Sequence, residues 1–428
     1  MQKECKIADN KIDSDAVYQQ SSMYYQRTIK DCWLDASKQF PALLLTGPRQ
    51  SGKTTLLRHL YEKDRRYASL DDPVLRQLAD EDCALFLERF PPPVLIDEIQ
   101  YAPQLLPHIK MAIDSARRPG MFWLTGSQQF VMMRGISESL AGRVGILNML
   151  GFSSRERNRR PGGKAFLPTS QITKNFGRQV PAPKMKNLYK NIWMGSFPAL
   201  VAGEVTNWEI FYGSYLQTYL QRDVRDLSQV GSQTAFLRFL RTCAARTGQL
   251  LNLSDLSRDA DISVNTAKQW LSILEASLQV YLLQPYHSNI TKRLVKRPKL
   301  YFLDTGLCAY LAQWMSPETL EAGAMSGAIL ETYVLSEIIK SWWHTGGIPP
   351  LYYYRDRDCR EIDFVFAQEN TIYPVEVKKS ASPRKQWTAH FSALKRLGPK
   401  VGDGTVFCLC RDVVPLAPRI NAVPVGLL

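Results

Sequence analysis

Residues 47–54 read G-P-R-Q-S-G-K-T and have the composition and spacing of a phosphate-binding loop. In such a loop the backbone N–H groups turn toward phosphate, the lysine reaches the β- and γ-phosphates, and the following hydroxyl binds Mg²⁺. We therefore expect Lys53 to contact the phosphates and Thr54 to ligate Mg²⁺. The expected nucleotide contacts are Gly47, Pro48, Arg49, Gln50, Ser51, Gly52, Lys53, Thr54 and Thr55.

Two acids follow a short apolar run further along the chain. Residues 93–96 read P-V-L-I, and Asp97 and Glu98 come directly after them. After a phosphate loop, such a pair suits Mg²⁺ binding through water by Asp97 and activation of the attacking water by Glu98. Acid pairs at strand ends are also common turn formers. The separation from the loop favours the catalytic interpretation, so we expect hydrolysis as well as binding.

Hydroxyl residues and an arginine complete this first group of chemically suited residues. The apolar run 121–124 is followed by Thr125 and Ser127, which we expect near the γ-phosphate or the attacking water. Arg143 ends the segment S-L-A-G-R, with Arg134 as a weaker candidate for the same role. The alternative for Arg143 is a charge at a helix C-terminus that interacts with the helix dipole.

A second constellation lies near the C-terminus. Residues 361–366 read E-I-D-F-V-F and residues 372–378 read I-Y-P-V-E-V-K, so each alternates like a strand. If Ala367 pairs with Ile372, Asp363 lies opposite Glu376, with Lys378 on the same face. Such carboxylates suit Mg²⁺ or Mn²⁺, and their repulsion predicts a raised pKa for at least one of them. The alternative is an acidic pair on a solvated sheet face.

This D…ExK pattern resembles the PD-(D/E)xK nuclease fold. The resemblance implies a further acid from a preceding helix, and Glu331 matches that position. Glu337 lies on a different face of the same expected helix. Glu331, Asp363 and Glu376 are therefore the expected metal ligands, with Lys378 beside them.

The elements that must position these residues indicate an α/β protein. An apolar strand at 43–45 leads into the loop and a helix at 55–60 leads out of it, as a phosphate loop requires. We expect a parallel sheet of the P-loop type, then a helical segment and winged helix, then an α/β nuclease-like domain. The expected divisions are an arm at 1–20, an ATPase core at 21–152, a basic linker or loop at 153–187, a helical segment at 188–231, a winged helix at 232–300 and the nuclease-like domain at 301–428.

The expected winged helix has a short first helix at 253–260 and a second helix from residue 264. The outer face of the second helix is polar but barely basic, which is weak for reading a DNA groove. The positive charges come later, where a wing would lie: residues 292–299 carry five, the last of them Lys299, and such a cluster suits backbone phosphates. The expected phosphate contacts are Lys292, Arg293, Lys296 and Arg297. The alternative is a module that docks protein.

Composition adds weaker constraints. The chain has 54 basic and 40 acidic residues, a formal net charge of +14, which favours a polyanionic partner. Its eight cysteines lack metal-ligand spacing and suit a reducing compartment. The sequence has no leader and no membrane-spanning segment, so we expect a cytoplasmic protein.

The order of phosphate loop, acidic strand, hydroxyl-ended strand and arginine resembles AAA-type ATPases. More specifically, the chain resembles a prokaryotic AAA-type family with a C-terminal domain of unknown function. The matching segments are G-P-R-Q-S-G-K-T-T at 47–55, S-L-A-G-R at 139–143, K-R-L-V-K-R-P-K-L-Y-F-L-D-T-G-L at 292–307, E-I-D-F-V at 361–365 and P-V-E-V-K at 374–378. The resemblance implies ATP and Mg²⁺ and a homo-oligomer in which Arg143 reaches a neighbouring site. It also implies that the helical segment 188–231 forms a lid over the nucleotide, with a sensing role for Arg222 in this lid.

Two hypotheses about function remain. The first is an ATP hydrolase that couples nucleotide state to nucleic-acid binding, with DNA favoured over RNA, and with metal-dependent cleavage by the C-terminal domain. The second is an ATP-dependent switch or scaffold that binds protein or DNA without cutting. A P-loop kinase is disfavoured because no acceptor pocket is indicated and two further modules would lack a role.

Overall fold

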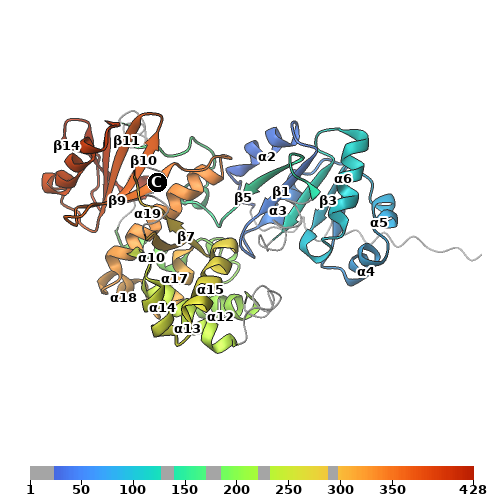
Figure 1. Cartoon of the computed structure of the whole chain (residues 1–428), viewed down its shortest axis with the longest axis horizontal. Coiled ribbons are helices and arrows are strands. Elements are labelled where there is room, and N and C mark those ends of the chain that lie inside the picture. Colours follow the sequence, from blue (N-terminus) through green and yellow to red (C-terminus); the bar gives the residue numbers. More distant parts are fainter. Residues whose placement is uncertain (1–23, 127–138, 170–184, 220–231, 288–296) are drawn as a thin grey trace, which may run out of the picture.

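The computed structural model describes residues 24–126, 139–169, 185–219, 232–287 and 297–428 (Figure 1). The first part, up to about residue 150, forms one side of the molecule. The helices of the middle of the chain and the C-terminal sheet form the other side. Among the described residues, no helix is long and apolar enough to cross a membrane.

The first part is built on a five-stranded sheet with the order β2-β3-β4-β1-β5, and its neighbouring strands run parallel. Its strands are β1 (Ala42–Thr46), β2 (Arg66–Ser69), β3 (Val94–Asp97), β4 (Phe122–Gly126) and β5 (Val144–Asn148). The three central strands are buried along their whole length, as apolar runs covered on both faces should be. The predicted parallel sheet is confirmed.

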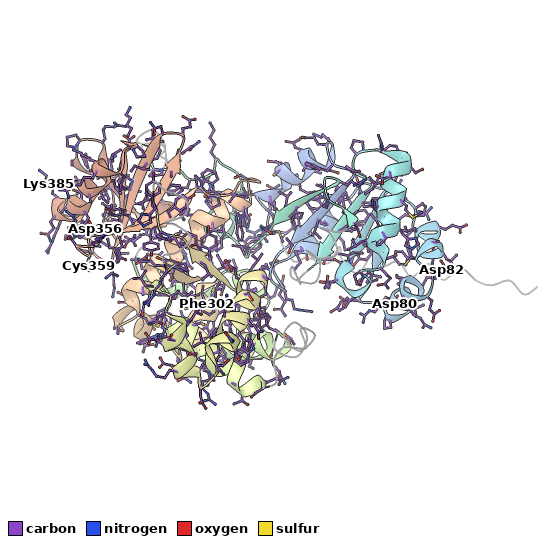
Figure 2. All side chains as sticks on the ribbon, in the orientation of Figure 1. Asp80, Asp82, Phe302, Asp356, Cys359 and Lys385 are labelled. Carbon is purple, nitrogen blue, oxygen red and sulfur yellow. The ribbon has the colours of Figure 1, made fainter. Side chains whose placement is uncertain are left out.

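Helices cover both faces of this sheet. Successive residues of each strand point to opposite faces, so neighbouring strand residues pack against different helices. The helices are α2 (Ile29–Ser37), α3 (Lys53–Leu60), α4 (Pro73–Glu81), α5 (Cys83–Arg89) and α6 (Leu105–Ala116), with a 3₁₀ turn η1 (Ile99–Tyr101). Leu44 packs in the core with α4, α5 and α6, whereas Leu43 and Leu45 pack in the core with α2 and α3. Figure 2 shows Asp80 and Asp82 at the end of this domain far from the C-terminal sheet.

The middle of the chain is mostly helical. It contains α8 (Ser154–Arg157), α10 (Met185–Met194), α11 (Pro198–Val201), α12 (Trp208–Thr218), α13 (Gln233–Ala245), α14 (Leu253–Ala260) and α15 (Val264–Ala276). The strands β6 (Gln249–Leu250), β7 (Val280–Leu283) and β8 (Lys299–Phe302) form an antiparallel sheet in the order β6-β8-β7. The helices predicted at 253–260 and from 264 are present. This element order is compatible with a winged helix, which stays a prediction.

The C-terminal part combines helices with a mixed seven-stranded sheet. Its helices are α17 (Thr305–Leu311), α18 (Pro317–Ala322) and α19 (Ser326–Trp343), with 3₁₀ segments η4 (Lys385–Leu397) and η5 (Val425–Leu427). Its strands are β9 (Leu351–Arg355), β10 (Glu361–Gln368), β11 (Thr371–Lys378), β12 (Lys400–Val401), β13 (Gly404–Cys408), β14 (Val414–Ala417) and β15 (Ile420–Pro424). The sheet order is β14-β15-β13-β11-β10-β9, with β12 beside β11. The predicted hairpin register is confirmed, because Ala367 pairs with Ile372.

The middle and C-terminal parts share one hydrophobic core, which runs from Leu150 to Leu427. Phe302 lies fully buried in it, and Figure 2 shows this residue between the helices and the C-terminal sheet. The expected boundary at residue 300 falls inside β8. The described part of the expected linker is packed: Phe166 contacts the rings of Phe366 and Phe407 in the same core. This packing was not predicted, because the segment begins with the strongly charged residues 153–160, which are typical of an exposed linker.

Candidate functional site

The phosphate-binding loop joins β1 to α3 and is shaped by close backbone contacts. A side chain at Gly47 would place its Cβ 2.0 Å from the carbonyl oxygen of Met149. Gly52 caps α3 with a φ of 89°, which favours glycine, and Gln50 also has a positive φ of 58°. The loop is therefore held in its turn by the chain that follows β5, as well as by its own glycines.

Lys53 is buried, and its ammonium group folds back over the loop. Its Nζ donates to the carbonyl oxygens of Gly47 at 3.0 Å and Pro48 at 2.9 Å. Arg49 reaches outward and donates to the hydroxyl of Tyr101 at 3.4 Å. Within the described residues, the buried hydroxyl oxygens of Thr46 and Ser51 have no hydrogen-bond partner. These two oxygens, next to a buried cation, fit a loop that binds an anionic group.

Asp97 collects three hydroxyl groups at the carboxyl end of β3. Thr54 Oγ1 lies 2.9 and 3.0 Å from its two carboxylate oxygens, Tyr67 donates at 3.1 Å, and Thr125 donates from the end of β4. Burial raises the pKa of Asp97, which these hydrogen bonds from Thr125 and Thr54 oppose. The structure thus brings together the two residues predicted to hold Mg²⁺.

Glu98 follows directly and turns away from the strand, because its φ of 58° is left-handed. Its backbone N–H donates to Thr125 Oγ1 at 3.0 Å, and its carboxylate accepts a hydrogen bond from Gln100. Thr125 therefore bridges both acids. Ser127, Arg134 and Arg222 lie outside the described residues.

Arg143 lies between the end of the expected helix and β5, and it is paired within the chain. Its Nε and Nη2 lie 2.6 and 3.1 Å from the two oxygens of Asp114, at the end of α6. This fork lowers the pKa of Asp114. The side chain of Arg143 remains one-third exposed. Its role in a neighbouring site stays a prediction.

The predicted C-terminal cluster is brought together by the β10–β11 hairpin. Asp363 is the next position after the pair Phe364–Val375, which places it across from Glu376. Asp363 accepts a hydrogen bond from the N–H of Val377 at 2.8 Å, and Glu376 accepts one from Lys378 at 2.5 Å. The second oxygen of Glu376, Oε2, is buried without a partner in the described part of the chain.

Glu331 joins this cluster from α19, as predicted, and Lys299 lies beside it. The expectation that Lys299 contacts phosphates with the other charges of residues 292–299 is wrong, because Lys299 is buried in β8. Lys299 of β8, 3% exposed, lies 3.2 Å from Glu331 and 2.5 Å from Glu361. Tyr301 also donates to Glu331. Glu337, on another face of α19, instead pairs with Lys340 at 2.9 Å.

The electrostatics of this cluster follow from burial. Burial, and next the charge of Asp363, raises the pKa values of Glu331 and Glu376. The raised pKa predicted for this cluster is confirmed, although burial outweighs repulsion. No group of three or more His, Cys, Asp or Glu residues in the described ranges is arranged to hold a metal ion. Lys299 and Lys378 occupy positions where they neutralise the acids.

The predicted phosphate-contacting residues are mostly outside the structural description. Lys292, Arg293 and Lys296 belong to the undescribed segment 288–296. Arg297 is exposed just before β8, and its carbonyl oxygen accepts a hydrogen bond from Tyr353. Binding of nucleic acid therefore stays a prediction.

Comparison with known proteins agrees with this geometry. Residues 39–158 match the family described as AAA domain. Residues 185–318 and 326–428 match two families described as domains of unknown function, DUF8612 and DUF4143. The uncharacterized proteins Rv2008c of Mycobacterium tuberculosis and Mb2031c of Mycobacterium bovis are each 30% identical over 346 residues, which is 80% of this chain and 71% of each relative.

The chain belongs to the family of these mycobacterial proteins. Its first part is an AAA-type P-loop domain. Two solved structures have weaker likeness. The Walker-type ATPase paby2304 of Pyrococcus abyssi is 16% identical, covers 67% of this chain and 96% of its own, and has a TM-score of 0.43. A single-residue variant of RuvB from Thermotoga maritima is 16% identical, covers 60% and 86%, and has a TM-score of 0.28.

Beside the phosphate loop of the AAA domain lies a cavity that the sequence did not indicate. It has a volume of about 260 Å³ and is lined by Tyr24, Tyr25, Gly52, Thr55 and Pro198, among others. The ring of Tyr24 stacks on His59 at 3.8 Å, and its buried hydroxyl has no partner within the described chain. The two tyrosines precede α2 and Pro198 begins α11, so only the tertiary fold brings them together.

Proposed function

We propose that this protein hydrolyses ATP with Mg²⁺ at the phosphate loop of the AAA domain. The observation that carries the proposal is the contact of Thr54 Oγ1 with both carboxylate oxygens of Asp97, next to buried Lys53. Those hydroxyl and carboxylate oxygens are the ligands that Mg²⁺ prefers. Bound Mg²⁺ would neutralise charge on the phosphates during transfer.

The residues have separate roles in this proposal. Lys53 leaves the carbonyl oxygens of the loop and contacts the phosphates, and Glu98 orients and deprotonates the attacking water. Thr125 holds Glu98 through its backbone N–H, and Ser127 is proposed to contact the γ-phosphate. The cavity beside Gly52 takes the base and ribose, where Tyr24 offers a ring and an unpartnered hydroxyl.

Two substitutions test the chemistry. Lys53→Ala should abolish ATP binding, measured by calorimetric titration, because it removes the buried cation. Glu98→Gln should bind ATP with Mg²⁺ and release no phosphate, because the amide cannot accept the proton from water. Phosphate release by Glu98→Gln at the wild-type rate would exclude Glu98 as the base, and absence of hydrolysis in the wild-type protein would refute the activity.

The proposal extends to what the nucleotide controls. We infer that ATP state governs nucleic-acid binding by the middle and C-terminal parts, with DNA favoured over RNA, and that residues 232–300 act as a winged helix. The net charge of +14 supports a polyanionic partner. Neutralising Lys292, Arg293, Lys296 and Arg297 together should weaken DNA binding with little sequence preference. It should also flatten the salt dependence by up to about four units of log–log slope. Unchanged affinity and slope would favour protein docking instead.

A second candidate function is metal-dependent phosphodiester cleavage at the C-terminal cluster, as the PD-(D/E)xK interpretation of residues 301–428 implies. The buried Oε2 of Glu376 favours it, because this oxygen has no hydrogen-bond partner in the described residues and could therefore bind a cation. The described residues fit a metal only in part, since Lys299 and Tyr301 already bind Glu331. Asp363 and Glu376 would hold the ion, and Lys378 would stabilise charge on the phosphate.

The full chain with plasmid or single-stranded DNA, with and without Mn²⁺ and ATP, separates the two hypotheses. Asp363→Ala should remove both the Mn²⁺-dependent rise in melting temperature and any cleavage. A rise without cleavage would support the switch that binds without cutting. No effect of Mn²⁺ on the wild-type protein would mean that the lysines alone neutralise the acids.

A further inference from the structure

We propose that Arg27 is a positioning residue for ATP hydrolysis and that buried Glu156 and His344 connect it to helix α19. The inference rests on the proposed ATPase activity and adds to it a physical connection between the nucleotide loop and the helix that carries Glu331. Three contacts in series make up this connection, which we call the Arg27–Glu156–His344 chain.

Arg27 lies just before α2 and contacts the backbone of the phosphate loop. Its Nη1 donates to the carbonyl oxygen of Ser51 at 2.9 Å, inside the loop. Its Nη2 donates to the carbonyl oxygens of Leu150 at 2.6 Å and Gly151 at 3.2 Å. One guanidinium fork therefore fixes two backbone segments that are about a hundred residues apart, and the orientation of the loop depends on it.

Glu156 provides the negative charge that keeps Arg27 in place. Its carboxylate is fully buried and lies 3.3 Å from Arg27 Nε. It also accepts hydrogen bonds from the backbone N–H groups of Thr28 at 2.7 Å and Ser153 at 2.9 Å. Despite burial, the charge of Arg27 holds the pKa of Glu156 below its usual range. A buried ion pair with this many hydrogen bonds is costly to disturb at one end, because the partner is left uncompensated.

His344 closes the chain of contacts from the end of α19. Its Nε2 accepts a hydrogen bond from the N–H of Leu150 at 3.3 Å, so the ring proton lies on Nδ1. Nδ1 in turn faces Glu156 at 3.4 Å. Burial lowers the pKa of His344, which keeps the ring neutral near pH 7. Leu150 is consequently held on one side by Arg27 and on the other by His344.

Helix α19 holds the same backbone at two further points. Glu337 accepts a hydrogen bond from the N–H of Ser154 at 2.6 Å, and Lys340 donates to the carbonyl oxygen of Phe152 at 3.1 Å. Glu331 lies 13 residues before His344 on this helix, a distance of about 20 Å along its axis. A shift of the phosphate loop on nucleotide binding would therefore displace a rigid helix that reaches the C-terminal carboxylates.

The test is steady-state ATP hydrolysis by the full chain. Arg27 borders the nucleotide cavity, whereas His344 is not among the described residues that line it. Substitution of His344 therefore tests the connection without changing a residue of that lining. His344→Phe should lower kcat by roughly three- to tenfold, with the KM for ATP within about twofold, because a displaced loop misorients the reacting groups. His344→Gln, whose amide oxygen can accept from Leu150, should restore most of kcat.

A double substitution shows whether the contacts act as one unit. Arg27→Lys should lower kcat about tenfold, and Arg27→Lys with His344→Phe should be no slower than the slower single variant. The control is Thr332→Val, a buried change on α19 at a residue whose hydroxyl contacts Thr247 and the carbonyl oxygen of Ala328. It should leave kcat unchanged, alone or with Arg27→Lys.

The outcomes are distinguishable from failure of the proposed function. No hydrolysis by the wild-type protein refutes the ATPase activity itself. Hydrolysis at the wild-type rate by His344→Phe refutes the connection. So does a double variant whose loss of kcat is the product of the two single losses. In either case Arg27, Glu156 and His344 only stabilise the fold. If His344→Phe does not fold, His344→Asn takes its place, since its shorter amide cannot reach Leu150; the comparison with His344→Gln then decides.

Discussion

At the scale of single residues, Gly47 shows how tightly the phosphate loop is fitted. Gly47→Ala would place a Cβ 2.0 Å from the carbonyl oxygen of Met149, a backbone atom that cannot rotate away. We expect the free energy of unfolding to fall by about 1–3 kcal/mol and ATP binding to be lost. Denaturant unfolding and nucleotide titration measure the two effects.

A matched control for this change is Gly327→Ala in α19. Apart from its chain neighbours and the nearby backbone of its own helix, no atom of the described residues lies within 4 Å of the Cβ that would be added there, and the position is helical. Stability should stay the same or rise by up to about 1 kcal/mol, because alanine favours a helix. Equal changes in the free energy of unfolding for Gly47→Ala and Gly327→Ala would show that the backbone at Met149, just after β5, moves away from the Cβ added at Gly47.

Glu376 gives a prediction for the pH dependence of stability. Burial, with the charge of Asp363, raises its pKa from 4.5 to about 8. The folded state therefore holds this proton more tightly than the unfolded state. The resulting stability is fully present below pH 4.5 and is lost as the pH rises through about 8. In Glu376→Gln, the fall of the melting temperature over this range should be smaller than in the wild-type protein.

The control for Glu376 is Glu369→Gln, which changes an exposed residue in the turn of the same hairpin. It should leave the pH profile unchanged. A wild-type profile in Glu376→Gln would show that Glu376 is ionised across the range and that Lys378 compensates it fully.

The residue scale also shows what the sequence could predict. Local alternation and a four-residue loop were enough to place Asp363 across from Glu376. The contacts of Lys299 with Glu331 and Glu361 could not be predicted, because β8 reaches them from another sheet. Arg27 was missed for the same reason: its partners at Leu150 and Glu156 are distant in the sequence.

At the scale of elements, the start of α17 connects three segments. Asp304 caps this helix by accepting from the N–H of Leu307 at 2.8 Å, and it also accepts from the hydroxyls of Tyr212 at 2.8 Å and Ser196 at 2.7 Å. Asp304→Ala should lower the free energy of unfolding by about 2–3 kcal/mol, because it leaves buried donors unpaired. Denaturant unfolding measures this loss.

Tyr212→Phe removes only one of these hydrogen bonds and serves as the graded control. Its loss should be about 1 kcal/mol. If the two substitutions lower the free energy of unfolding equally, the cap on α17 contributes nothing beyond the tyrosine contact.

The turn at residues 195–198 was recognisable from its glycine and proline, but its partner at Asp304 was not.

At the scale of the whole molecule, the exposure of Arg143 leads to a prediction about assembly. Its side chain is paired with Asp114 but one-third exposed, which leaves part of it open to a second copy of the chain. Mixing Arg143→Ala protein with Glu98→Gln protein should then restore some ATP hydrolysis, because some shared sites would combine an intact base with an intact arginine. Phosphate release across mixing ratios measures it.

Sedimentation with and without ATP provides the accompanying measurement for Arg143. A protein that stays monomeric with ATP, and mixtures without recovery, would assign Arg143 to the ion pair with Asp114 alone.

The strand, loop and helix at the phosphate-binding motif and the β10–β11 hairpin were predictable, since each lies in a local pattern of strand or helix. The shared core of the middle and C-terminal parts was not, because it depends on contacts far apart in sequence.

That shared core has a consequence for the order of events during synthesis on the ribosome. The sheet of the AAA domain is complete once β5 has emerged at Asn148, so this domain can fold early. His344, which supports its phosphate loop, arrives about 200 residues later, on the order of ten seconds or more at ordinary elongation rates. During that interval the nascent protein carries a folded but unsupported nucleotide site, together with apolar side chains from Leu150 onward that cannot be fully covered before Leu427 is made.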